Sequence, residues 1–134
     1  MELPAEVREL LEGANFAHLA TLMPDGSPHS IPVWAGLEDG RIAFFTQPTT
    51  QKARNVERDP RVALSVVDHE RPYRSARIRG RVVDKRTGDA ALEVMDRLAL
   101  RHTGKPFPMR QGVLYLVEPE RAGFMELPFE RRGP

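Results

Sequence analysis

The sequence predicts a mostly β fold of the α+β class, with six or seven antiparallel strands in a closed or partly closed barrel and a few peripheral helices. Three observations predict it: short β-prone segments recur along the chain, tight-turn residues separate the first of them, and few segments have helical spacing. We expect a single domain over residues 1–134, because this length suits one hydrophobic core and no linker or repeat divides it.

The first half of the chain predicts a short helix followed by a three-stranded meander. Residues 4–12 place apolar side chains on one helical face, and Gly13 ends this helix. The turn after the first strand contains Asp25 and Gly26, a pair that readily adopts the positive φ angles of hairpin turns. The expected strands are residues 16–23, 29–37 and 41–46.

The second half predicts two more helices among further strands. Residues 51–58 form a short helix that ends at Asp59, because a residue before proline is pushed out of helical geometry. Residues 88–102 form the one long helix, with apolar residues spaced for burial. Gly80, in the middle of a strand, predicts a bulge or bend. The expected strands are residues 61–67, 74–85, 112–117 and 122–127.

Composition excludes several classes of function. The 20 basic and 19 acidic residues give a net charge of +1, which argues against a nucleic-acid partner. The absence of cysteine excludes disulfides and thiol chemistry. No apolar run reaches the ~18 residues of a membrane span, and the N-terminus lacks a signal-peptide pattern, so we expect a cytoplasmic protein without a membrane partner. A local anion-binding groove is still compatible with this charge balance, because five arginines lie within residues 71–81.

The segment FFTQPTTQKARN, residues 44–55, is the most informative in the chain. An apolar strand runs into a polar loop, and a helix then opens with Lys52 and Arg54 in its first turns. Cations at a helix N-terminus are unfavourable by roughly 0.3–1 kcal/mol each. An anion held there by backbone N–H groups, threonine hydroxyls and the lysine removes this conflict. The segment is therefore interpreted as a phosphate-binding corner, with two solvated cations on a surface helix as the alternative.

Three stretches of the chain resemble a known superfamily: ATLMPDGSPHSIPVW, FFTQPTTQKARNVERDPRVALSVVD and YRSARIRGRVVD. They are similar to the pyridoxamine 5′-phosphate oxidase-like split β-barrel superfamily, and most of all to its branch of deazaflavin (coenzyme F420)-dependent oxidoreductases. The likeness covers residues 5–127. It implies a split β-barrel and a homodimer that binds flavin or deazaflavin at the subunit interface. The implied cofactor is F420, with FMN as the alternative.

The resemblance also implies a set of cofactor-binding residues. Those assigned to the phosphate are Thr46, Gln51 and Lys52, with Thr49, Thr50 and Asn55 close by. Those assigned to the ring are Ile31, Pro32, Val33 and Trp34, and the opposite subunit is expected to contribute Ser75 and Arg77. Gln51 stands where FMN-using members often carry arginine, which weakly disfavours FMN. Arg79 receives no role from the resemblance.

The implied activity is hydride transfer between reduced F420 and an unsaturated small molecule. An FMN-dependent oxidase or reductase and a non-catalytic cofactor- or haem-binding module are the alternatives. The catalytic residue stays unknown: His18 is expected to be a barrel residue, and His29 is either a proton donor near the ring or a surface residue. The histidines lack metal-ligand spacing, so no metal is predicted. Trp34 has two interpretations, a wall of the binding site or a core residue.

Overall fold

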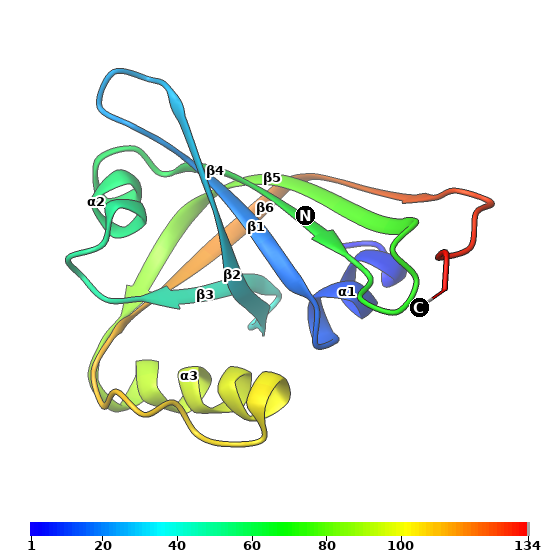
Figure 1. Cartoon of the computed structure of the whole chain (residues 1–134). Helices are drawn as coiled ribbons and strands as arrows, with labels where there is room; N and C mark the ends of the chain where they lie inside the picture. The colour runs from blue at the N-terminus through cyan, green and yellow to red at the C-terminus, as the bar shows by residue number, and fades with distance from the viewer. Residues whose placement is uncertain (134) are drawn as a thin grey trace.

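Residues 1–133, described by a computed structural model, form a closed antiparallel barrel with the strand order β1-β2-β3-β6-β5-β4 (Figure 1). The mostly β class and the barrel are therefore confirmed. The strands are β1 (Phe16–Leu22), β2 (Pro28–Glu38), β3 (Arg41–Thr46), β4 (Arg61–Val67), β5 (Arg74–Arg86) and β6 (Val113–Glu126). The helices are α1 (Ala5–Glu12), α2 (Gln51–Arg58) and α3 (Gly88–Thr103).

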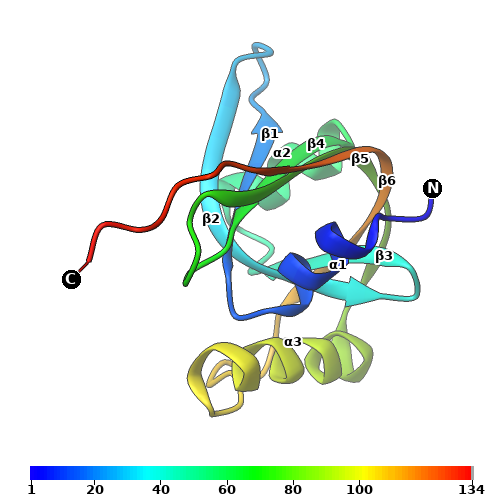
Figure 2. The ribbon, with the colours of Figure 1, turned by 90° about the vertical axis from the view of Figure 1, so that its right-hand side faces the viewer.

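The main core fills the barrel, and two short helices close its ends. Alternate strand residues point inward, such as Ala17 and Leu19 of β1, as the two-residue period of a strand requires. Leu10 of α1 and Val56 of α2 join the same core. Figure 2 looks along the barrel and shows α1 in front of the ring of strands and α2 behind it. Both helices therefore contribute apolar side chains where the barrel would otherwise be open.

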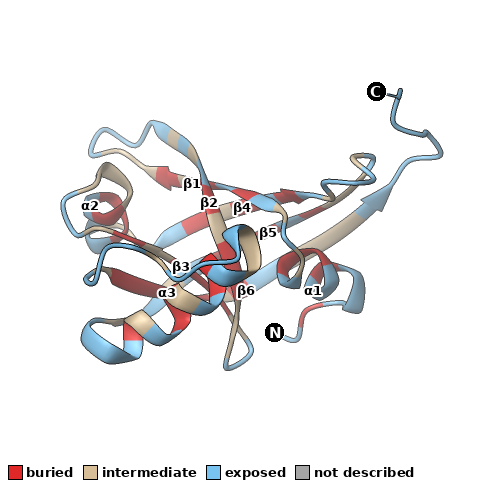
Figure 3. Ribbon diagram, turned by 60° about the horizontal axis from the view of Figure 1, so that its bottom comes forward, coloured by how far each residue is buried: buried red, intermediate tan, exposed pale blue. Residues whose placement is uncertain are grey.

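The long helix α3 lies outside the barrel and forms a second, smaller core. Its residues Met95 and Leu98 pack against Ala43 of β3 and against Leu114 and Leu116 of β6. The other face of α3 is exposed, in agreement with the predicted amphipathic pattern (Figure 3). This helix covers one outer face of the barrel and leaves the outer face of β4 and β5 bare.

The barrel has six strands, in agreement with the expected six or seven, but two of the expected strands are in fact one. Residues 112–117 and 122–127 were expected to be separate strands, but they belong to one strand, β6. The ladder to β5 continues through a register shift next to Gly80, which pairs with Pro119. A Cβ atom on Gly80 would collide with the carbonyl oxygen of Glu118, so only glycine lets the two backbones approach this closely. The bulge predicted at Gly80 is confirmed.

One edge of β2 is open along most of its length. Only residues 35–38 of β2 pair with β3, whereas residues 28–34 pair with β1 alone. Pro32 lies in this open stretch, where its missing N–H costs little in ladder hydrogen bonds. The open edge provides a border for a binding site beside the barrel.

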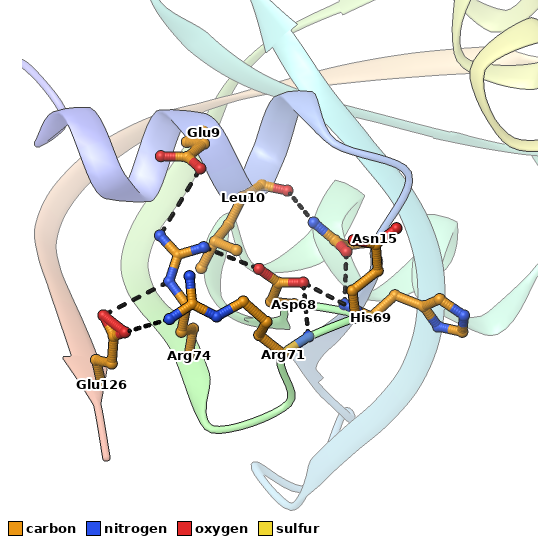
Figure 4. A network of polar contacts seen from close by, with 9 residues as sticks. Glu9, Leu10, Asn15, Asp68, His69, Arg71, Arg74 and Glu126 are labelled. Carbon is orange, nitrogen blue, oxygen red and sulfur yellow. Dashed lines mark hydrogen bonds and ion pairs between the residues drawn. The ribbon is translucent and has the colours of Figure 1, made fainter. Parts of the chain in front are cut away.

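A charged network fastens the N-terminal helix to the sheet (Figure 4). Arg74 of β5 contacts Asp68 at 2.9 Å, Glu9 of α1 at 3.7 Å and Glu126 of β6 at 3.7 Å. Arg71 contacts the same Glu126 at 3.0 Å. Arg71 and Arg74, two of the five arginines in residues 71–81, therefore stabilise the fold.

No helix among residues 1–133 combines the length and the apolar character that crossing a membrane requires.

Candidate functional site

A cleft of about 340 Å³ lies beside the open edge of β2, between the end of β3 and the start of α2. Many of the predicted cofactor-binding residues line it together, although they come from separate parts of the sequence. These are Pro32, Val33, Trp34, Thr46, Thr50 and Lys52. The fold thus brings the predicted ring wall and part of the predicted phosphate corner to one cavity.

Aromatic side chains form one wall of the cleft. Trp34 lies edge-on to Phe45 and to Phe107, with ring centroids 6.1 and 6.3 Å apart. Phe45 and Phe107 are themselves 5.0 Å apart, and Phe16 lies opposite Trp34 in the β1–β2 ladder. Trp34 is only partly buried and borders the cleft, so it both packs against its neighbours and offers a flat apolar surface.

His102 supports this wall from behind, a role that the sequence did not reveal. Its ring stacks on Trp34 with centroids 5.0 Å apart and an interplanar angle of 5°. Its Nε2 atom is buried and makes no hydrogen bond within residues 1–133. Burial, with a smaller contribution from the charge of Arg101, lowers the pKa of His102, so the ring stacks on Trp34 in its neutral form near pH 7.

Threonine hydroxyls form the polar end of the cleft. Thr46, the last residue of β3, lies 2.9 Å from Thr50 between their Oγ1 atoms. Thr50 is the N-cap of α2, and its Oγ1 accepts a hydrogen bond from the N–H of Ala53 at 3.3 Å. The first turn of α2 contains no acidic residue that would complement the helix dipole.

Lys52 is the cation of the cleft. Its side chain is partly buried, and within the described part of the chain it forms no ion pair. Burial lowers the pKa of Lys52, because no nearby carboxylate offsets the loss of solvation. Arg54 behaves differently: its guanidinium donates to the carbonyl of Thr49 at 2.6 Å and to the amide oxygen of Gln51 at 2.7 Å. Of the two cations in this segment, Lys52 is therefore the one placed to meet a ligand.

The other predicted site residues lie outside this cleft. Ile31 packs against the barrel core, and Thr49 is exposed beyond the cleft lining. Asn55 is fully buried and donates to the hydroxyl of Thr21 at 3.0 Å. Gln51 donates to the side-chain oxygen of Asn55 at 2.8 Å. The Asn55 side chain thus serves the packing of α2 against β1, and the assignment of these residues to the cofactor stays a prediction.

Ser75 and Arg77 lie on β5, away from the cleft of their own chain. Arg77 borders a second hollow of about 550 Å³ on the bare outer face of the barrel. Arg79, which the resemblance gave no role, lines the same hollow. His18 lines it as well and is exposed, which corrects the expectation of a barrel residue: it points outward from β1. His29, the candidate proton donor, borders neither hollow.

Comparison with known proteins agrees with the architecture. Residues 3–125 match the family model described as pyridoxamine 5′-phosphate oxidase. A solved F420 reductase is similar at 30% identity, with 90% of this chain and 98% of that chain covered and a TM-score of 0.78. A conserved hypothetical protein, Rv2991 from Mycobacterium tuberculosis, is similar at 23% identity over 100% of this chain and 98% of that chain, with a TM-score of 0.74.

A putative pyridoxamine 5′-phosphate oxidase from Listeria innocua is also similar, at 17% identity over 81% of this chain and 86% of that chain, with a TM-score of 0.62. No curated protein matches the sequence. The resemblance read from the sequence is confirmed: the chain belongs to the pyridoxamine 5′-phosphate oxidase family, which includes oxidoreductases, binds flavin-type cofactors and typically forms dimers.

Proposed function

We propose that the protein is an F420-dependent oxidoreductase that transfers a hydride between the reduced deazaflavin and an unsaturated small molecule. We further propose that it works as a cytoplasmic homodimer, with the cofactor in the cleft between β2, β3 and α2. The similarity to a solved F420 reductase over most of both chains supports the choice of cofactor.

The observation that carries this proposal is the state of Lys52. A partly buried lysine without an ion pair is costly, because desolvation weakens its charged form. The same cleft contains threonine hydroxyls at the start of a helix and a wall of aromatic rings. A flat molecule with an anionic tail fits both features: the rings face its planar part, and Lys52 meets its phosphate.

The roles of the residues follow from their placement. The helix N-terminus with Thr46, Thr50 and Lys52 would bind the phosphate and so fix the position of the ring along β2. Trp34, stacked on His102, would hold the ring plane and exclude water from it. When bound, the deazaflavin supplies the hydride chemistry. Transfer of a hydride to a double bond also consumes a proton, and no side chain that lines the cleft is an evident donor of it.

FMN is the second candidate, because the matching family binds flavin-type cofactors in general. The resemblance implies arginine at position 51 in many members that use FMN, but this chain has Gln51 there. The Gln51 side chain is neutral and forms hydrogen bonds with Asn55 and Arg54. It therefore adds no positive charge for the FMN phosphate. Gln51 thus weakly disfavours FMN, and the similarity to a solved F420 reductase supports F420.

The decisive experiment uses the single tryptophan of the chain. Because Trp34 borders the cleft, a flavin bound there should quench its fluorescence. Titrations with F420 and with FMN give two dissociation constants, and we expect F420 to bind at least about tenfold more tightly, a difference of about 1.4 kcal/mol. Tighter binding of FMN would contradict the assignment of F420 and would make FMN the proposed cofactor.

A second measurement separates an enzyme from a carrier. Reduced F420 is mixed with quinones, enones and tetrapyrroles, and its reoxidation is followed by absorbance. We expect turnover with at least one class of substrate. Tight binding with no turnover on any of them would instead indicate a non-catalytic cofactor-binding module.

A further inference from the structure

The loop between α3 and β6, residues 104–112, carries a single side chain into the cleft beside β2. It runs back along α3 from the C-terminal end of that helix to the start of β6 (Figure 1). Every residue from 103 to 111 is exposed except Phe107. Phe107 is also the one residue of this loop that lines the cleft. The conformation of the loop therefore decides where one aromatic ring of the cleft lies.

A closed set of hydrogen bonds holds the backbone of Phe107 on both sides. The N–H of Phe107 donates to Oδ1 of Asp96, on α3, at 3.1 Å. Arg110 donates through Nη1 to the same Oδ1 at 2.9 Å and to the carbonyl oxygen of Phe107 at 2.8 Å, and through Nη2 to Oδ2 of Asp96 at 3.0 Å. Hydrogen bonds to ionised groups are stronger than neutral ones. We call this set of contacts the Asp96 clamp.

The clamp is charged near pH 7. The hydrogen bonds from Arg110 lower the pKa of the Asp96 carboxyl, burial opposes them, and the N–H of Phe107 assists them. Asp96 thus stays ionised and accepts from both partners at once. Among residues 1–133 it is the only group outside the loop that forms a hydrogen bond or ion pair with residues 106–110.

The two ends of the loop are held separately. Gly104 ends α3 with a φ of 77°, and its N–H donates to the carbonyl of Leu100 at 2.9 Å. At the other end, the side-chain amide of Gln47 donates to the carbonyl of Gln111 at 2.8 Å. Between these points the clamp is the polar contact that fixes Phe107. Loss of Asp96 would therefore release Phe107 while both ends of the loop stay in place.

Phe107 extends the aromatic wall of the cleft beyond the strands. Its ring lies edge-on to Trp34, with centroids 6.3 Å apart and an interplanar angle of 87°. It lies edge-on to Phe45 as well, at 5.0 Å and 80°. Trp34 and Phe45 belong to β2 and β3, so the barrel itself fixes their backbones. Phe107 alone among these three rings depends on a loop, and hence on the clamp, for its position.

We propose that Phe107 binds the planar part of the ligand in this cleft, and that Asp96 is a positioning residue that acts through the backbone of Phe107. That the ligand is a flavin-type ring rests on the proposed function. The contacts of the clamp are all made within one chain, so they do not depend on how a partner subunit completes the site.

The first measurement uses the protein without ligand. Trp34 is the single tryptophan, and Phe107 packs against it, so acrylamide quenching of its fluorescence reports whether Phe107 stays in place. Asp96→Asn should raise the quenching constant towards that of Phe107→Ala. Arg110→Gln changes an exposed side chain and so threatens folding little, and it should raise the constant in the same way.

The matched control for these variants is Arg97→Gln. Arg97 follows Asp96 on the same helix, but its ion pair, at 3.0 Å, is with Glu38 of β2 and not with the loop. Removing it takes one ion pair from α3 and leaves the clamp intact. Its quenching constant should equal that of the wild type.

The second measurement is the affinity for two ring compounds without a phosphate, riboflavin and the deazaflavin core of F420, by quenching of Trp34. Asp96→Asn and Phe107→Leu should each weaken binding by at least about fivefold, as expected for loss of an aromatic contact. Phe107→Tyr keeps the ring and should bind like the wild type. If Asp96 acts through Phe107, adding Asp96→Asn to Phe107→Leu should cost less than about twofold more.

Equal affinity of the wild type and Asp96→Asn for the compound that binds, or fully additive losses in the double variant, would overturn the positioning role of Asp96. Wild-type affinity in Phe107→Leu would overturn the role of Phe107. Each of these results leaves binding to the wild-type cleft intact, so the proposed function would survive it. If neither ring compound bound the wild type, the proposed function and the roles of both residues would fail together.

Discussion

Arg74 and Lys52 are both partly buried cations, but their surroundings are opposite. The side chain of Arg74 is 13% exposed and lies within 3.7 Å of Asp68, Glu9 and Glu126 (Figure 4). Lys52 lies at a cleft with no carboxylate partner in the described chain. The contrast separates cations that hold the fold together from cations that the fold leaves free for a ligand.

The same contrast divides the arginine-rich segment of residues 71–81. Arg71 and Arg74 pair with carboxylates at the end of the barrel near α1, whereas Arg77 and Arg79 lie uncompensated on its bare outer face. If this division reflects function, removing a paired cation should lower stability, and removing a free one should lower affinity for an anion. The predictions below test this division.

Arg74→Leu should cause the largest loss of stability. The substitution leaves Asp68, whose side chain is 17% exposed, without its nearest cation, and it removes the contacts to Glu9 of α1 and Glu126 of β6. We expect the free energy of unfolding to fall by about 1–3 kcal/mol, measured by urea denaturation. Arg79→Leu, on the same strand but without an ion pair, should change it by less than about 0.5 kcal/mol. Equal losses in the two variants would remove the distinction between paired and free arginines.

The stack of His102 on Trp34 should make stability and fluorescence depend on pH. The folded-state pKa of His102 lies below its ordinary value of 6.5, so below pH 6.5 the unfolded chain takes up the proton more readily. Stability should therefore decrease as the pH falls from 6.5 towards the folded-state pKa, by an amount on the order of 1 kcal/mol per pKa unit. Over the same range the fluorescence of Trp34 should change as the stacked ring becomes charged.

The control for this titration is His102→Gln, which removes the titrating ring but keeps a polar side chain at the end of α3. The fluorescence change below pH 6.5 should disappear in this variant. If the fluorescence change persisted in His102→Gln, another group would be responsible. That result would contradict the claim that His102 is the titrating group stacked on Trp34.

Lys52→Gln should have the smallest effect on stability. The ammonium group has no carboxylate partner to lose, and burial already disfavours its charge. We expect the melting temperature to stay unchanged or to rise slightly, corresponding to less than about 0.5 kcal/mol. A loss as large as that of Arg74→Leu would show that Lys52 belongs to the fold and not to a ligand site.

Much of the fold could be predicted from the sequence, because its signals are local. The Asp25-Gly26 turn, the proline after Asp59 and the spacing of apolar residues in α3 each act on neighbouring residues. The continuity of β6 could not be predicted. Pro119 would normally interrupt a strand, but here the ladder continues through a register shift, where Gly80 of a distant segment admits the backbone beside it.

The candidate site could be predicted only in part, for the same reason. Lys52, Thr46 and Thr50 lie within seven residues of one another, so the segment alone indicated an anion-binding corner. The stack of His102 on Trp34 and the gathering of Arg77, Arg79 and Arg121 depend on how distant strands and α3 are arranged in space. Nor could the sequence show which arginines of the segment 71–81 find carboxylate partners, because those partners come from α1, β6 and the loop before β5.

The claim that Lys52 binds the phosphate of a flavin-type cofactor is tested most directly by comparing cofactors with and without that group. Dissociation constants are measured from Trp34 fluorescence for FMN against riboflavin, and for F420 against its deazaflavin core lacking the phosphate tail, in wild type and in Lys52→Gln. Lys105→Gln, which removes one charge outside the cleft lining, serves as the control. We predict that Lys52→Gln weakens the phosphate-bearing cofactors by at least about tenfold and leaves the phosphate-free compounds unchanged. Equal affinity of wild type and Lys52→Gln for all four compounds would contradict the assignment of this cleft.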